Sequence, residues 1–229
     1  MEAKAGNRGD KTMHGNVLLN METPSVQYLC RRDKRLAKVV SLVGGISYMP
    51  YDDGYAFLVR QIVNQMLSNK VGAVLYGRME RLCGGKVCPD AIMKLSEDEL
   101  RGVGISRPKV GYIRNLTAAI ESGNMRLDSL ASMPDDEVIK KLTSIRGIGT
   151  WSAKMYLIFV LDRQDILPYE DAAFLQGYGW TYKTDDFSPA AVKKKCRKWS
   201  PYASIAARFM YRALDSGLTK QEFHLFKTS

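Results

Sequence analysis

Short amphipathic segments, separated by glycine, proline and acidic residues, follow one another along most of this chain. After Asp33, apolar residues recur at three- and four-residue spacing and so share one helical face, namely Leu36, Val39, Val40 and Val43. The same spacing predicts helices at 55–65, 70–82, just before Val103, 108–122, 135–142, 150–161, 171–177, 189–198 and 201–215. The sustained alternation that marks a half-buried strand is not evident. We therefore predict an all-α fold.

Residues 1–24 lack such periodicity, and the first sixteen are polar and rich in glycine. We expect this segment to be a flexible N-terminal tail, with a short ordered stretch at Val17–Leu19. The chain has 229 residues, of which 45% are hydrophobic, enough for one large domain or two small ones. It has no apolar run of about 18 residues, and its charged N-terminus is unlike a secretory signal. These features predict a soluble, intracellular protein.

The net charge and the small numbers of cysteines and histidines limit the kinds of partner and reaction that this chain could have. The net charge of +10 suits a polyanionic partner. The four cysteines form no C-x-x-C pair, so we expect neither zinc nor an iron–sulfur cluster. The two histidines lie near the chain ends, which argues against histidine-dependent triads and zinc hydrolases. Carboxylates acting with backbone amides are the chemistry that remains.

A two-glycine turn, Gly147-Ile148-Gly149, separates a short helix at about 136–142 from the helix at 150–161. Glycine permits positive φ and lets another backbone approach closely. The N–H groups of Gly147, Gly149 and Thr150 lie at a helix N-terminus, which attracts anions such as a DNA phosphate. The alternative is an ordinary helix corner that uses glycine only for its geometry.

A second turn, at Pro168, brings Glu170 and Asp171 to the start of the next predicted helix. An aspartate before Ala172 is a good N-cap, and it need do nothing more. Asp171 can serve both as an N-cap and as a reactive carboxylate, because a helix N-terminus favours the negative form of the side chain. Such a carboxylate can stabilise a developing sugar cation or accept a proton from attacking water. Glu170 is the competing candidate.

The hairpin and the acidic pair some twenty residues downstream resemble the helix-hairpin-helix DNA glycosylases. Residues 60–70 resemble the R-x-I-x-x-Q-x-L-S stretch of the 3-methyladenine DNA glycosylase II family. Residues 106–113 are similar to its G-(I/L)-S-x-x-K-x-x-Y-(I/L) segment, and Lys198–Tyr202 to its W-x-P-(W/Y) turn. The resemblance extends from about Asp33 to Leu214.

The resemblance implies two helical lobes, one of residues 53–163 and one of residues 25–52 plus 164–229, with a cleft between them. It implies that Asp171 is catalytic, since the family's aspartate is second in the acidic pair. Met66 would be the wedge that enters the DNA where a nucleotide flips out; the alternative is a methionine packed between helices. The base pocket would contain Trp151, Met155, Tyr202 and Glu170. A Na⁺ or K⁺ ion would bind the backbone carbonyls of Thr143, Ile145 and Ile148.

The resemblance also predicts the activity. Relatives that cut the DNA strand carry a lysine where this chain has Trp151, so no lyase activity is expected. Lys154, three residues further along the helix, should face elsewhere. We expect a monomeric, monofunctional glycosylase that excises alkylated purines from double-stranded DNA without an organic cofactor. The alternatives are a helix-hairpin-helix glycosylase for a deaminated or mismatched base, and a non-catalytic DNA-binding module.

Overall fold

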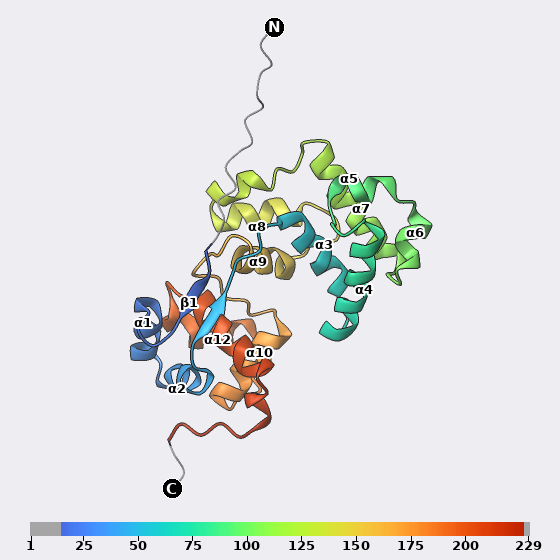
Figure 1. Ribbon diagram of the computed structural model, residues 1–229. Helices are drawn as coiled ribbons and strands as arrows, with labels where there is room; N and C mark the ends of the chain where they lie inside the picture. Colours follow the sequence, from blue (N-terminus) through green and yellow to red (C-terminus); the bar gives the residue numbers. More distant parts are fainter. Residues whose placement is uncertain (1–14, 227–229) are drawn as a thin grey trace.

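The computed structural model describes residues 15–226, which form helices arranged in two lobes (Figure 1). The helices are α1 (Pro24–Arg32), α2 (Lys34–Val43), α3 (Gly54–Asn64), α4 (Asn69–Leu82), α5 (Pro89–Lys94), α6 (Glu97–Gly102), α7 (Arg107–Glu121), α8 (Asp135–Thr143), α9 (Thr150–Phe159), α10 (Ala172–Tyr182), α11 (Pro189–Cys196) and α12 (Ala203–Asp215). Short 3-10 helices are η1 (Asp128–Ser132), η2 (Arg197–Trp199) and η3 (Leu218–Lys220). The all-α prediction is confirmed. Within residues 15–226, no helix has the length and apolar character needed to cross a membrane.

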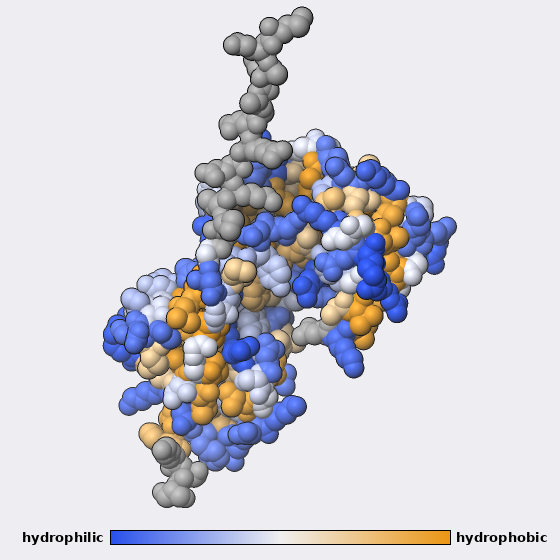
Figure 2. Space-filling model, in the orientation of Figure 1, coloured by the Kyte–Doolittle hydropathy of each residue, from blue (hydrophilic) through white to orange (hydrophobic). Residues whose placement is uncertain are grey.

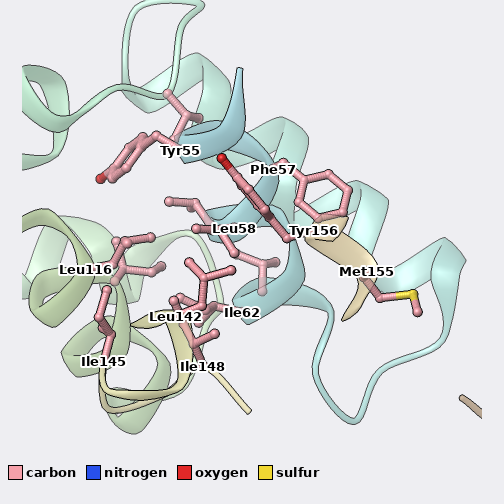
Figure 3. Close-up of a cluster of buried hydrophobic side chains, with 14 of the residues drawn as sticks. Tyr55, Phe57, Leu58, Ile62, Leu116, Leu142, Ile145, Ile148, Met155 and Tyr156 are labelled. Atoms are coloured by element: carbon pink, nitrogen blue, oxygen red, sulfur yellow. The ribbon is translucent and has the colours of Figure 1, made fainter. Parts of the chain in front are cut away.

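The first lobe is built around a hydrophobic core contributed by residues between Tyr55 and Ile166. Leu58 and Ile62 of α3 meet Leu142 of α8 and the hairpin residues Ile145 and Ile148 there (Figure 3). The two isoleucines are 6% and 4% exposed, so burial of their side chains fixes the turn between α8 and α9. The same burial leaves the glycines of the turn at the surface of the lobe.

The second lobe joins segments from both ends of the described chain, residues 19–46 and 174–223, around its own core. Asp33 lies inside it, 2% exposed, and its side chain caps α2. The same carboxylate accepts hydrogen bonds from Tyr182 and from the Trp199 indole (2.9 Å), and pairs with Lys198 (3.0 Å). Burial works to raise the pKa of Asp33, but these hydrogen bonds outweigh it and hold that pKa below its ordinary value.

The structure adds two short strands and the helices α1 and α5 to the predicted elements, and it lengthens α10. Val17–Leu19 forms strand β1, which pairs antiparallel with β2 (Ile46–Tyr48), and α1 follows at once. The short ordered stretch predicted at Val17–Leu19 is therefore present as a strand, and residues 1–14 lie outside the described part. Helix α10 continues past Gly177 to Tyr182, because a glycine there lets α10 approach Met210 of α12, where a Cβ atom would lie 3.0 Å from the Met210 backbone oxygen.

Candidate active site

A cavity of about 1160 Å³ lies between the two lobes, where the molecular surface is hollowed (Figure 2). Residues of both cores contribute to it, which no single motif could have specified. Its lining includes six aromatic side chains, Tyr48, Tyr51, Phe57, Trp151, Phe159 and Tyr211, together with Met155, Glu170 and Asp171. Four of the rings form a row in space. The ring centroids lie 5.0 Å apart for Tyr51 and Phe57, 6.5 Å for Phe57 and Phe159, and 5.9 Å for Phe159 and Tyr211. The cavity thus offers a flat apolar ligand several stacking surfaces beside a carboxylate.

Asp171 is 8% exposed and stands at the N-terminus of α10, facing the cavity. One carboxylate oxygen accepts the backbone N–H of Phe174 at 2.7 Å, and the other accepts the indole N–H of Trp151 at 2.7 Å. Two donors and the positive end of the helix dipole therefore favour a negative charge at this carboxylate. Each oxygen keeps a second lone pair with which it can receive a proton. The bond to Trp151 could not be foreseen from the motifs.

Tyr211 of α12 completes the wall beside Asp171. Burial raises the pKa of its phenol well above the ordinary value, and the nearby Asp171 charge raises it further. Tyr211 is accordingly a neutral phenol at working pH, able to donate one proton in a hydrogen bond. It adds no second negative charge to the cavity.

The Glu170 carboxylate forms an ion pair with Lys154. Both of its oxygens lie 2.8 Å from the Lys154 ammonium, whose side chain is 9% exposed. The same ammonium lies 3.5 Å from the ring centroid of Tyr169. Lys154 is absent from the residues that line the cavity, in keeping with the prediction that it faces elsewhere. Of the two acids, Asp171 is the one without a paired cation in the contacts described above.

A buried arginine supports another part of the cavity wall. Arg208 of α12 is 7% exposed and pairs with Asp162 at 2.9 Å, while it donates to the Ile158 carbonyl at 2.6 Å. Its guanidinium lies 3.6 Å from the centroid of the Tyr48 ring. Burial raises the pKa of Tyr48 to about 12 against the opposing effect of Arg208. This cluster joins β2 to α9 and α12, so it holds the two lobes together at the cavity.

The two hairpin glycines serve different purposes. Gly147 has φ +108°, and a Cβ atom there would overlap the root of the Tyr112 side chain, so it needs glycine for the fold. Gly149 has φ −94°, an ordinary value that any residue can adopt, and a Cβ there would meet nothing within 4 Å. It is the N-cap of α9 and, as a glycine, has no side chain with which to cap that helix. An exposed helix N-terminus is thus available to an anion beside Gly149 and Thr150.

The carbonyl groups expected to bind an alkali ion lie in or next to this turn. Thr143 is the last residue of α8, and the Ile148 N–H donates to the Ile145 carbonyl at 3.0 Å. A carbonyl oxygen has a second lone pair, so that hydrogen bond leaves Ile145 able to coordinate an ion.

Met66 lies at the mouth of the cavity and is completely exposed. This excludes the packed alternative. Its backbone has φ +59°, a left-handed conformation that costs a residue other than glycine about 1–3 kcal/mol. A strained backbone under a fully exposed apolar side chain is expected where the side chain meets a partner.

Tyr202 does not belong to the cavity wall, which corrects the sequence prediction. Its ring packs edge-on against Tyr28 with centroids 5.3 Å apart, and Trp199 of the same turn is completely buried against Asp33. The W-x-P-Y turn therefore stabilises the second lobe. Met155, by contrast, lines the cavity while it belongs to the buried cluster of the first lobe (Figure 3).

Fold and site together define the class of the protein. An exposed glycine hairpin that stands beside an acidic, aromatic cavity between two helical lobes is the arrangement of the helix-hairpin-helix DNA repair proteins.

Comparisons with known proteins give the family. Residues 59–201, more than half of the chain, match the model of the HhH-GPD superfamily of base excision DNA repair proteins. DNA-3-methyladenine glycosylase 1 of Schizosaccharomyces pombe is 27% identical over 78% of this chain and 80% of its own length. The structure of a Bacillus halodurans DNA-3-methyladenine glycosidase has a TM-score of 0.79 and 30% identity, covering 91% of this chain and 97% of that chain. A Schizosaccharomyces pombe 3-methyladenine DNA glycosylase in complex with abasic DNA has a TM-score of 0.77 and 25% identity, covering 84% and 97%. The chain belongs to the HhH-GPD superfamily.

Proposed function

We propose that this protein is a monofunctional DNA glycosylase that flips alkylated purines out of double-stranded DNA and excises them by hydrolysis. The observation that carries the proposal is Asp171, held by two hydrogen bonds at the wall of an aromatic cavity. Relatives named as 3-methyladenine glycosylases support the substrate class. The test is direct: chromatography and mass spectrometry of the bases released from DNA with known lesions.

The reaction that we propose breaks the bond between C1′ of the deoxyribose and the base nitrogen. The electron pair of that bond leaves with the base, and the sugar acquires oxocarbenium character. The Asp171 carboxylate stabilises this charge and accepts a proton from the water whose oxygen bonds to C1′. The products are the free base and an abasic sugar. Lys154 takes no part, because its ammonium is paired with Glu170.

The substrates that we expect follow from the poor supply of proton donors in the cavity. Within residues 15–226 no histidine lines the cavity, and Glu170 is bound to Lys154. A site with a poor general acid acts best on bases that leave without protonation. N-alkylated purines carry a positive charge that weakens the glycosidic bond, and cations stack favourably on aromatic faces. We therefore propose 3-methyladenine and 7-methylguanine in preference to neutral lesions.

Trp151→Ala is expected to lower excision of 7-methylguanine by about 3- to 30-fold, the range of a cation–π contact. Affinity for undamaged duplex should change little. Trp151→Phe is the control, because it keeps an aromatic face but removes the N–H that binds Asp171. Single-turnover rates on a panel of lesions measure both effects. Fast release of uracil or 8-oxoguanine, with none of the methylated purines, would show that the alkylation assignment is wrong.

Incubation with lesion-containing DNA and borohydride is expected to trap no covalent complex. Trp151 stands where relatives that cut the strand carry a lysine. The nearest lysine along the helix, Lys154, forms an ion pair with Glu170. Product strands should remain intact until alkali is added, which a denaturing gel shows. A trapped adduct that disappears in Lys154→Met would overturn the monofunctional proposal.

Two other functions remain as outcomes of the same lesion panel: a glycosylase for deaminated or mismatched bases, and a non-catalytic DNA-binding module that releases nothing. We further propose that the protein acts as a monomer, in the bacterial nucleoid or the eukaryotic nucleus. An alkali ion, Na⁺ or K⁺, would bind Thr143, Ile145 and Ile148 through their carbonyl groups, since backbone carbonyl oxygens can replace the hydration shell of such ions. No zinc or iron–sulfur cluster is proposed.

A further inference from the structure

The exposed Met66 stands on a tight turn at the end of α3. The Leu67 N–H donates to the Asn64 carbonyl at 3.0 Å, which closes a four-residue turn. Gln65 has φ −49° and ψ 127°, and Met66 has φ +59°, the combination of a type II turn. Glycine or asparagine is normally favoured at the position that Met66 occupies. Something else must therefore hold the methionine in this conformation.

Lys109, from the first turn of α7, supplies that restraint. Its ammonium donates to the Val63 carbonyl at 2.8 Å and to the Gln65 carbonyl at 2.7 Å. These carbonyls flank the C-terminus of α3, where helix carbonyls have no partner within the helix. Lys109 thus fixes the backbone at Gln65, the residue just before Met66.

The same turn is tied to the DNA-binding hairpin. The Gln65 side-chain amide donates to the Gly147 carbonyl at 2.9 Å. Tyr112, three residues after Lys109 and on the same face of α7, packs against Gly147. One face of α7 therefore contacts both the Met66 turn and the hairpin, two elements far apart in the sequence.

We propose that Lys109 is a positioning residue that fixes Met66 relative to the hairpin, so that a duplex whose backbone is bound at Gly149 receives the methionine at the flipped nucleotide. This rests on the proposed base excision. A lysine that only caps α3 would contribute stability and nothing else. Positioning instead requires Lys109 and Met66 to act in the same step, which a double-mutant cycle measures.

The experiment compares Lys109→Met, Met66→Ala and the double variant in single-turnover excision of 7-methylguanine. Arg114→Met is the matched control, since Arg114 lies on α7 and donates to the Ile92 and Leu95 carbonyls, away from the turn. We expect Lys109→Met to slow excision from paired DNA by about 10- to 100-fold, the usual cost of misplacing a group by about 1 Å. The double variant should be no slower than Met66→Ala. Where the lesion faces an abasic site and is already unstacked, Lys109→Met should act within about twofold of the normal rate.

Lys109→Arg, which keeps a cation for the two carbonyls, should restore most of the rate on paired DNA. Should Lys109→Met fail to fold, Gln65→Leu, which removes only the link to Gly147, replaces it in the cycle. Two results would overturn the proposal. In one, the excision rate of the double variant falls by the product of the factors for Lys109→Met and Met66→Ala. In the other, Lys109→Met slows excision equally on paired and unstacked lesions. Failure of the proposed function is separate: the unaltered protein would then release no base, while 2-aminopurine fluorescence in bound duplex still reports insertion of Met66.

Discussion

Asp171→Asn is expected to lower single-turnover base excision by about a thousandfold or more, equivalent to roughly 4 kcal/mol of transition-state stabilisation. The amide keeps the size of the side chain but cannot carry the negative charge that opposes the developing sugar cation. One of the two present donors, the Phe174 N–H or the Trp151 indole, would face the new amide group. We therefore expect a loss of about 1–3 kcal/mol in unfolding free energy. Affinity for abasic-site DNA should be retained.

Glu170→Gln is the matched control for this prediction, because it neutralises the neighbouring acid in the same turn. Its main consequence should be a weaker contact with Lys154, and excision should fall by far less than in Asp171→Asn. Circular dichroism and thermal unfolding of both variants separate loss of fold from loss of chemistry. A fully active Asp171→Asn beside an inactive Glu170→Gln would show that the catalytic acid has been assigned to the wrong residue.

Gly147→Val is expected to unfold the hairpin region, whereas Gly149→Val should fold normally and bind DNA poorly. At Gly147 a β-branched residue must adopt φ +108° and also displace Tyr112, so its cost exceeds the roughly 1–3 kcal/mol of backbone strain alone. At Gly149 the added side chain meets open space in the free protein; in the DNA complex that we propose, it would occupy the place of a phosphate. Thermal unfolding and duplex binding measured on both variants give the comparison.

The loss in Gly149→Val should be nearly the same for damaged and undamaged duplex, since backbone contacts carry no sequence information. The slope of log affinity against log salt should become shallower by about 1, as one phosphate contact disappears. A loss confined to damaged DNA would place Gly149 at the base cavity, contrary to its position at the start of α9. Normal binding by a folded Gly149→Val would remove the hairpin from the DNA interface.

Features encoded within a few neighbouring residues could be predicted from the sequence. Helix α2 begins directly after Asp33 and α9 directly after Gly149, as the pattern predicts, and the capping box of Ser96 and Glu99 starts the helix predicted before Val103. Each depends on backbone donors and side chains three or four residues apart, so local chemistry is sufficient to specify it. The N-cap role of Asp171 belongs to the same group.

Sequence patterns were less informative where long-range packing decides the outcome. Helix α1 has only two buried residues, Val26 and Leu29, too few for a clear period. Gly177 marks an expected helix end, yet it lies inside α10 because α12 packs closely against it. Tyr202 follows a turn that resembles a pocket motif, but burial of Trp199 against Asp33 draws that turn into the second lobe.

The sequence by itself determined most of the helices, the glycine hairpin and the presence of an acidic pair before α10, because these depend on residues adjacent along the chain. Only the tertiary structure decided which of the two acids pairs with a lysine. Lys154 pairs with Glu170, and Trp151 donates to Asp171, across the space between α9 and the start of α10. The cavity wall likewise combines Tyr48, Phe57, Phe159 and Tyr211 from four separate elements. Their convergence depends on burying two hydrophobic cores against each other, and that free energy is a property of the whole fold.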